Sequence, residues 1–226
     1  MNLCDIDQIK ALLARHGFRF SKSMGQNFLI QPWVPRDIAC SSGAGSGKGV
    51  LEIGPGIGPL TRELSLLADQ VVSVELDRSL LPILTETLGD RDNVEIVSGD
   101  ILKLDIPSLV RERFQGLEPI ACANLPYNIT TPAITALLDA GCFSSITIMI
   151  QREVARRICA TPGSGDYGAF SVYCQYHAET ELLFEVPPDC FLPAPKVTSS
   201  VLRLTPKDPP DEVDDPDHFF RVVKAA

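Results

Sequence analysis

The stretch GVLEIGPGIG at residues 49–58 decides the fold. Its first half is a short apolar run typical of a buried strand, and its second half places glycine at positions 54, 56 and 58. Glycine allows a sharp turn and lets a ligand approach the backbone closely. Residues 57–68 then show the apolar spacing of a helix. We interpret the segment as a strand, a tight turn and a helix, although such a turn can also be purely structural.

The same alternation continues along the chain. The pattern predicts further strands at 70–76, 93–100, 119–126 and 145–151, and helices at 78–88, near 105–115 and at 131–140. Buried strands that alternate with helices form a mostly parallel sheet covered on both faces. Two last strands, at 182–190 and 197–206, are close enough in sequence to form an antiparallel pair at the far edge. The predicted fold is therefore α/β, with seven mostly parallel strands, an antiparallel edge strand and helices on both faces.

Other segments flank this core. Residues 5–16 have helical spacing, and a polar stretch with the sequence RFSKSMGQNFLIQP follows as a loop. Near the other end, DPPDEVDDPD at 208–217 holds six acidic residues and no basic one. We expect a main domain at 1–206, whose residues 1–47 form a helix, a covering loop and a second helix. An acidic linker at 207–217 and the start of a truncated helical domain at 218–226 would follow.

Composition narrows the class of protein. The chain has 226 residues, of which 45% are hydrophobic and 22% charged, as in ordinary soluble domains. No apolar run could span a bilayer, and no signal peptide is evident, so we expect a cytoplasmic protein without membrane contact. Seven scattered cysteines and three histidines show no ligand spacing, so we expect no metal site. The net charge of −9 argues against nucleic acid, whose binders usually carry a basic surface.

The ends of the predicted strands nevertheless suit a nucleoside. In open α/β sheets, ligands bind beyond the carboxyl ends of the strands. Glu75 follows Gly54 by about 20 residues, a position from which a carboxylate accepts hydrogen bonds from ribose hydroxyls. Asp100 could accept from an adenine amino group with Ile101 against the ring, or it could only cap the next helix. Pro59 replaces the third glycine of a dinucleotide fingerprint, so S-adenosylmethionine suits the site better than NAD.

Three stretches carry a resemblance to a known family. They are NLPY at 124–127, SKSMGQNFL at 21–29 and FLPAPKVTSSVLRL at 191–204. Together they resemble the ribosomal RNA adenine N6,N6-dimethyltransferases, in particular the bacterial branch that acts on the small subunit. The resemblance covers about residues 8 to 205. It implies a Rossmann-like, class I S-adenosylmethionine-dependent methyltransferase fold. We also expect a monomer.

The resemblance implies a specific reaction. Methyl groups would pass from S-adenosylmethionine to the N6 amino group of two adjacent adenosines, in a hairpin loop near the 3′ end of 16S rRNA in the 30S particle. The side-chain oxygen of Asn124 and the backbone carbonyl of Leu125 would accept the two amine hydrogens, and Pro126 would hold the carbonyls in place. Tyr127 would stack on the base. The gain in rate would come from orientation and electrostatics.

The resemblance adds the covering segment to the expected cofactor contacts and Phe191 to the expected substrate contacts. The expected cofactor contacts are Gln26, Asn27, Leu29, Gly54, Gly56, Glu75, Leu76, Asp100, Ile101 and Asn124. For the substrate base we expect Phe191 opposite Tyr127, although both rings could instead be core residues. Arg152 and Arg156 share one helix face, and with Lys196 they could meet RNA phosphates. A solvated basic face explains these residues about equally well.

Three alternatives stay open on the sequence. Antibiotic-resistance methylases of the same family act on large-subunit RNA, but they more often have Ile where this chain has Leu125. A non-catalytic RNA- or DNA-binding assembly factor could keep the fold, although it need not keep NLPY and Glu75. A dehydrogenase is disfavoured by Pro59 and by the lack of a convincing catalytic His or Tyr–Lys pair.

Overall fold

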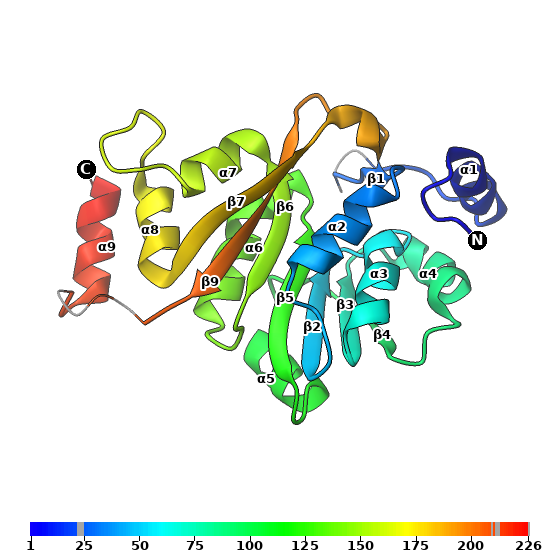
Figure 1. Ribbon diagram of the computed structural model, residues 1–226, viewed down its shortest axis with the longest axis horizontal. Coiled ribbons are helices and arrows are strands. Elements are labelled where there is room, and N and C mark those ends of the chain that lie inside the picture. Colours follow the sequence, from blue (N-terminus) through cyan, green and yellow to red (C-terminus); the bar gives the residue numbers. More distant parts are fainter. Residues whose placement is uncertain (22–24, 209, 211–212, 226) are drawn as a thin grey trace.

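The computed structural model describes residues 1–21, 25–208, 210 and 213–225. Its main feature is a seven-stranded sheet with the order β4-β3-β2-β5-β6-β9-β7, seen at the centre of Figure 1. The strands are β2 (Lys48–Ile53), β3 (Gln70–Glu75), β4 (Val94–Ser98), β5 (Glu118–Asn124), β6 (Ile146–Gln151), β7 (Ala178–Val186) and β9 (Ser199–Pro206). The five strands from β2 to β6 are mutually parallel. The predicted α/β fold with a mostly parallel sheet is therefore confirmed.

The antiparallel part of the sheet differs in detail from the prediction. β9 runs antiparallel to both of its neighbours and lies between β6 and β7, so the edge position belongs to β7. The strand predicted at 182–190 ends at Val186 and begins earlier, at Ala178. Pro187 and Pro188 cannot donate ladder hydrogen bonds, and a short 3₁₀ turn over Pro188–Cys190 replaces the end of the predicted strand.

Helices cover both faces of this sheet. Those predicted from periodicity are α3 (Pro59–Leu67), α4 (Leu81–Leu88), α5 (Ile106–Arg113) and α6 (Thr130–Asp139), with α1 (Ile6–Arg15) and α2 (Trp33–Ser41) before them. A short helix that begins with Arg152, α7 (Arg152–Ile158), follows β6. The sequence analysis did not predict α8 (Ala169–His177), which packs beside α7. No helix in the described part of the chain is long and apolar enough to cross a membrane.

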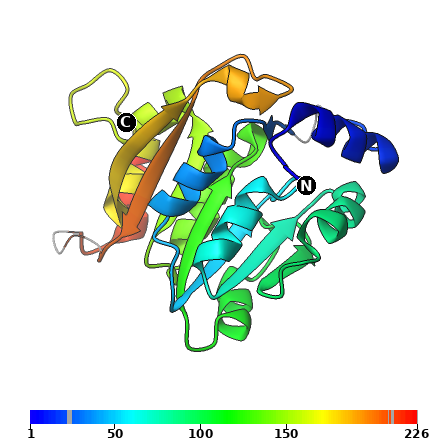
Figure 2. The ribbon, with the colours of Figure 1, turned by 45° about the vertical axis from the view of Figure 1, so that its right-hand side comes forward.

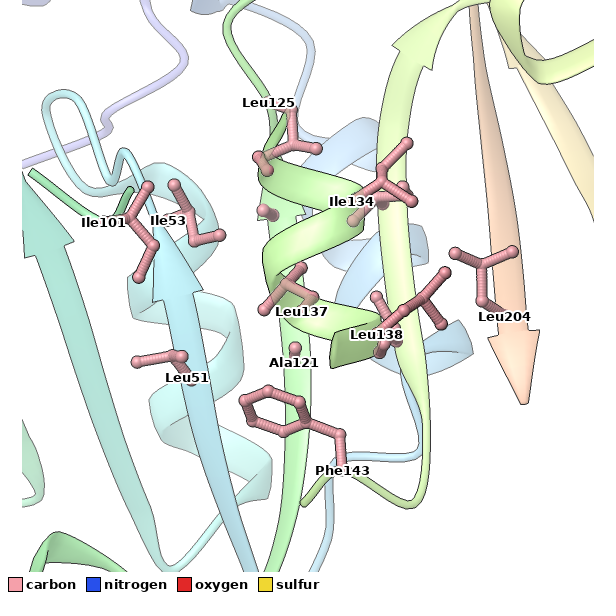
Figure 3. Packing of buried hydrophobic residues seen from close by; sticks show 14 of the residues in the cluster. Leu51, Ile53, Ile101, Ala121, Leu125, Ile134, Leu137, Leu138, Phe143 and Leu204 are labelled. Carbon is pink, nitrogen blue, oxygen red and sulfur yellow. The ribbon is translucent and has the colours of Figure 1, made fainter. Parts of the chain in front are cut away.

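The side chains of successive residues in each central strand pack alternately into two separate cores, one on each face of the sheet. Leu51 and Ala121 face the core that contains α5 and α6, while their neighbours Val50 and Ile120 face the core that contains α2 and α3. This alternation follows from the two-residue period of a strand. Figure 3 shows the first core, where side chains of α6 such as Leu137 lie against the sheet. A strand buried on both faces explains why these strands read as continuous apolar runs.

A second, two-stranded sheet joins segments that are far apart in sequence. β1 (Phe28–Leu29) pairs antiparallel with β8 (Phe191–Leu192), with Leu29 opposite Phe191. Figure 2 shows the connection between β7 and β9, which contains β8, beside the N-terminal segment. The predicted covering loop and the FLPAPKV stretch are thereby held together next to the ends of the parallel strands.

The predicted terminal helix is present as α9 (Pro216–Ala225), and it begins two residues before the predicted start. It packs on α8 through aromatic contacts: the ring of Tyr176 lies 5.8 Å from Phe219 and 5.0 Å from Phe220. In Figure 1 this helix lies at the opposite end of the molecule from α1. Parts of the predicted acidic linker, at 209 and 211–212, fall outside the described residues.

Candidate active site

One pocket lies where the carboxyl ends of the parallel strands meet the N-terminal segment. The pocket is lined by every residue predicted as a cofactor contact and by all four residues of NLPY. Phe191 lines it as well, whereas Arg156 and Lys196 do not. Residues that the sequence analysis did not single out also line it, among them Glu52 and Asp77.

The glycine turn forms the floor of this pocket. Gly54, Gly56 and Gly58 all have positive φ, at 67°, 62° and 93°, where residues with a Cβ are strained. A Cβ atom on Gly56 would lie 3.3 Å from the ring of Phe28, so the covering segment packs directly on the turn. Pro59 is the first residue of α3, a position that suits proline because its missing N–H would have no helical partner. At Gly54 and Gly56 the turn therefore presents bare backbone to a ligand, with Pro55 between them also lining the pocket.

Glu75 lies at the end of β3 with its carboxylate beside the glycine turn. It is 6% exposed, and it accepts hydrogen bonds from the backbone N–H groups of Asp77 (2.8 Å) and Gly56 (3.3 Å). Burial raises the pKa of Glu75, while these backbone hydrogen bonds act in the opposite direction. Each carboxylate oxygen receives one backbone bond and keeps further acceptor capacity. The carboxylate is thus oriented before any ligand binds.

Glu52 is a second buried carboxyl beneath the turn, and its role was missed from sequence. It is 1% exposed, and its Oε2 accepts from the hydroxyls of Thr61 and Ser73, both at 2.6 Å. These bonds join β2 to α3 and to β3, whose Ser73 lies opposite Glu52 in the sheet. Burial raises the pKa of Glu52 to about 7. The sequence feature that could have indicated this role is an acidic residue inside an otherwise apolar strand.

The raised pKa makes the stability of the fold depend on pH. Between the ordinary value of 4.5 and about 7, the unfolded chain is ionised at Glu52 while the folded chain keeps its proton, so stability falls as the pH rises. We expect Glu52→Gln to remove this loss, which reaches about 3 kcal/mol by pH 8. Urea unfolding of both proteins between pH 5 and 8 measures it. Parallel stability curves for the two proteins would contradict the expectation.

The predicted adenine contacts lie at the end of β4. Asp100 Oδ1 accepts from the backbone N–H of Leu102 at 3.1 Å, and Oδ2 lies 3.4 Å from Lys103 Nζ. Asp100 therefore stabilises a turn and lines the pocket, but it does not cap the next helix as the alternative interpretation held, because the N-cap of α5 is Asp105. Ile101 is buried at 4% exposure, whereas Leu76 is 50% exposed. An apolar surface of this kind can cover a flat ring.

The NLPY segment leaves β5 at the rim of the same pocket. The backbone N–H of Leu125 donates to the carbonyl of Met149 on β6 at 3.1 Å, which fixes the segment to the sheet. Pro126 packs near Gly54, where an added Cβ atom would lie 3.7 Å from its ring. In the described part of the chain, the Asn124 carboxamide has no hydrogen-bond partner although it is half-buried. The sheet holds the backbone of Asn124 opposite Met149, and its unpaired amide is available to a ligand.

Two aromatic rings line the pocket beyond this segment. Tyr127 is partly buried, and its hydroxyl lies 2.8 Å from Ser199 Oγ. Burial raises the pKa of Tyr127, so it is a neutral phenol at physiological pH. Phe191 is 3% exposed and belongs to the core cluster around α2, which agrees with the alternative interpretation of this residue as a core ring. Phe191 also lines the pocket.

The covering segment closes the pocket from the N-terminal side. Gln26 donates to Asp77 Oδ2 at 2.7 Å and accepts from the backbone N–H of Ser21 at 3.1 Å. Asn27 donates to the carbonyl of Gly25 at 3.1 Å. Residues 22–24 of the predicted loop fall outside the described residues. The bond between Gln26 and Asp77 joins the covering segment to the turn that follows Glu75.

The predicted basic contacts lie on α7 and after β8. Arg152 and Arg156 both face Glu185 of β7, each at 3.5 Å from a different carboxylate oxygen. Lys196 is exposed in the loop that precedes β9. Among the described residues, no group of three or more His, Cys, Asp or Glu side chains is placed to hold a metal ion.

Comparisons with known proteins agree with this geometry. The family model described as "Ribosomal RNA adenine dimethylase" matches residues 17–226. Proteins named "Ribosomal RNA small subunit methyltransferase A" are similar: that of Alkaliphilus oremlandii is 46% identical over 96% of this chain and 76% of its own, and that of Shouchella clausii is 47% identical over 96% and 74%.

Two solved structures are also similar. A dimethyladenosine transferase from Plasmodium falciparum has a TM-score of 0.74 at 26% identity, covering 87% of this chain and 69% of its own. The 23S rRNA methyltransferase ErmE has a TM-score of 0.71 at 31% identity, covering 88% and 78%.

Proposed function

The chain belongs to the ribosomal RNA adenine dimethylase family, and from this premise we propose that it dimethylates the N6 amino group of two adjacent adenosines in small-subunit ribosomal RNA. The methyl donor is S-adenosylmethionine. The observation that carries the proposal is that NLPY, the glycine turn and Glu75 line one pocket. The small subunit is favoured over the large one because the relatives named for it reach 47% identity, against 31% for ErmE.

The glycine turn and the two acidic strand ends suit the adenosyl part of the cofactor. Glu75 can accept from both ribose hydroxyls, and Asp100 with Ile101 can bind the adenine. When bound, the cofactor supplies an electrophilic methyl group on a sulfonium. Gln26, Asn27 and Leu29 would cover its methionine end and exclude water.

The NLPY segment orients the amine that receives the methyl group. The lone pair of an adenine N6 nitrogen is delocalised into the ring, so this nitrogen is a poor nucleophile. If Asn124 Oδ1 and the Leu125 carbonyl each accept one N–H, the lone pair is directed out of the ring plane towards the methyl group. This is catalysis by placed dipoles, and it needs no strong general base.

A stacked base cannot reach this pocket, so the adenosine must be flipped out of the RNA. Tyr127 would stack on one face of the flipped base, a contact worth about 1–3 kcal/mol. Phe191 would meet the other face at the edge of its ring, since most of its surface packs in the core.

Arg152 and Arg156 of α7 are the proposed contacts for RNA phosphate, and Glu185 competes with the phosphate for them. We expect Glu185→Gln to raise the affinity for RNA about two- to fivefold at low salt, because exposed ion pairs of this kind are weak. The gain should vanish near 0.3 M salt, given roughly 6 Å of screening length. Fluorescence anisotropy with a labelled hairpin RNA measures it.

Glu181→Gln is the matched control, because Glu181 lies on the same strand but pairs with Arg203 of β9. Equal affinities for both variants and the unaltered protein would show that Arg152 and Arg156 do not contact RNA.

The proposed function is tested by labelled S-adenosylmethionine. The protein is incubated with 30S particles that lack the modification and, separately, with 23S RNA. Digestion of the RNA should yield N6,N6-dimethyladenosine from the 30S particles. Label in 23S RNA alone would favour a large-subunit target, and unlabelled RNA together with measurable RNA binding would favour a non-catalytic assembly factor.

A further inference from the structure

The ring of Tyr127 is held at its far end by a residue of another strand. Its hydroxyl lies 2.8 Å from the Oγ of Ser199, the first residue of β9, which is 72 positions further along the chain. Ser199 is fully buried, at 0% exposure. It contributes no atom to the predicted chemistry, and it does not line the pocket.

Ser199 is a rigid anchor because β9 lies inside the sheet. Its backbone is placed opposite Gln151 of β6 on one side and Val186 of β7 on the other. The adjacent Thr198 accepts a hydrogen bond from the backbone N–H of Arg152 at 3.0 Å. The strands β6 and β7 and the first residue of α7 therefore fix the backbone that carries the Ser199 hydroxyl. Only rotation of the short side chain can move this hydroxyl.

The hydrogen bond determines where the ring points. The phenol oxygen lies on the axis of χ2, so a bond to it leaves rotation about χ2 free but restrains χ1, which moves the oxygen through space. The backbone of Tyr127 is restrained separately: Pro126 precedes it with φ −57° and ψ 133°, and the carbonyl of Tyr127 accepts from Thr130 Oγ1 at 3.3 Å. With backbone and χ1 both fixed, the ring stays at the wall of the pocket.

We propose that Ser199 is a positioning residue for methyl transfer, which acts by holding the Tyr127 ring where the flipped adenine stacks. This inference rests on the proposed function. A ring that is already in place loses little conformational freedom when the base arrives, and the base is then held at a defined distance from Asn124. Binding of the cofactor should not depend on this contact, because Ser199 does not line the pocket.

A double-mutant cycle tests the inference. Ser199→Ala and Tyr127→Phe each remove one partner of the bond while keeping the ring, and each should lower kcat about three- to tenfold. The combined variant should be no slower than Tyr127→Phe alone, because Ser199 then has no hydroxyl to hold. The Kd for S-adenosylmethionine should be unchanged in all three. Losses that multiply would overturn the inference, since Ser199 would then act independently of Tyr127.

Ser200→Ala is the matched control. Ser200 is also buried, at 2% exposure, but as the next residue of the strand it points to the other face of the sheet. It should keep full kcat. A second measurement uses RNA with 2-aminopurine at the target position, whose fluorescence falls when the base is stacked. Ser199→Ala should show less quenching than the unaltered protein, whereas equal quenching contradicts a role in stacking. If the unaltered protein transfers no methyl group, the proposed function fails first.

Discussion

Replacement of Asn124 by Ala is expected to lower methyl transfer about 10²–10³-fold, the loss typical when one preorganised dipole is removed from an active site. Asn124 ends β5 at the pocket, half-buried and unpaired in the described part of the chain. Its side-chain oxygen is the proposed acceptor for one amine hydrogen. Without it, that hydrogen is unpaired in a partly dry site and the lone pair of the nitrogen remains in the ring.

Asn124→Asp separates the role of the acceptor from the shape of the side chain. It keeps an oxygen at the same position but loses the amide N–H₂, so we expect a loss on the order of tenfold. Single-turnover transfer of labelled methyl groups to 30S particles measures both variants. Calorimetric titration with S-adenosylmethionine shows whether cofactor affinity changed as well. If Asn124→Ala kept more than a tenth of the rate, the amine would be oriented by other groups.

Much of this site could be predicted because the carboxyl ends of parallel strands converge at one edge of a sheet. Gly54, Glu75, Asp100 and Asn124 each end or follow a strand that is recognisable from its apolar run, so the fold alone brings them together. The resemblance added the covering segment and Phe191, which periodicity could not have placed. β1 and β8 have only two residues each, too few to show any period.

Other features depend on register and packing that a single sequence does not reveal. Ser199 meets Tyr127 only because β9 inserts between β6 and β7, and Glu52 meets Ser73 only because β2 and β3 pair in that register. The helix α8 was missed because its sequence, AFSVYCQYH, is rich in aromatic residues, which do not favour a helix. Its packing against α7 and α9 outweighs that preference.

The predicted arginine contacts show the limit of reasoning from charge. A net charge of −9 argues against nucleic acid, whereas Arg152 and Arg156 were predicted either to meet RNA phosphates or to form a solvated basic face. The structure pairs both of them with Glu185, so the unliganded face is closer to neutral than the sequence suggested. The proposed contact with RNA phosphate would therefore replace Glu185 as the partner of these arginines, and such an exchange would depend on the salt concentration.

Replacement of Glu75 by Gln is expected to weaken S-adenosylmethionine binding at least about 100-fold. The carboxylate performs two tasks: it accepts from the backbone of Gly56 and Asp77, and it offers its remaining acceptor capacity to the ribose. An amide has one oxygen and one N–H₂ group, so one of the two backbone donors would face another donor. Two hydrogen bonds to a charged group, at about 1.5 kcal/mol or more each, account for the expected loss.

Calorimetric titration with S-adenosylmethionine gives the affinity, and thermal unfolding shows whether the variant still folds. Glu95→Gln is the matched control, because Glu95 lies on the neighbouring strand, pairs with Arg113 and does not line the pocket. It should bind the cofactor as the unaltered protein does. Similar affinities for the Glu75 and Glu95 variants would mean that the ribose is held by other groups.

The pH dependence provides a separate test of the same role. Because burial raises the pKa of Glu75 above the ordinary 4.5, its carboxylate gains a proton at a higher pH than an exposed glutamate does. Protonation removes acceptor capacity from one oxygen. The unaltered protein should therefore lose cofactor affinity as the pH falls through that raised value, whereas the affinity of Glu75→Gln should stay level over the same range. A parallel decline in both proteins would assign the pH dependence to another group.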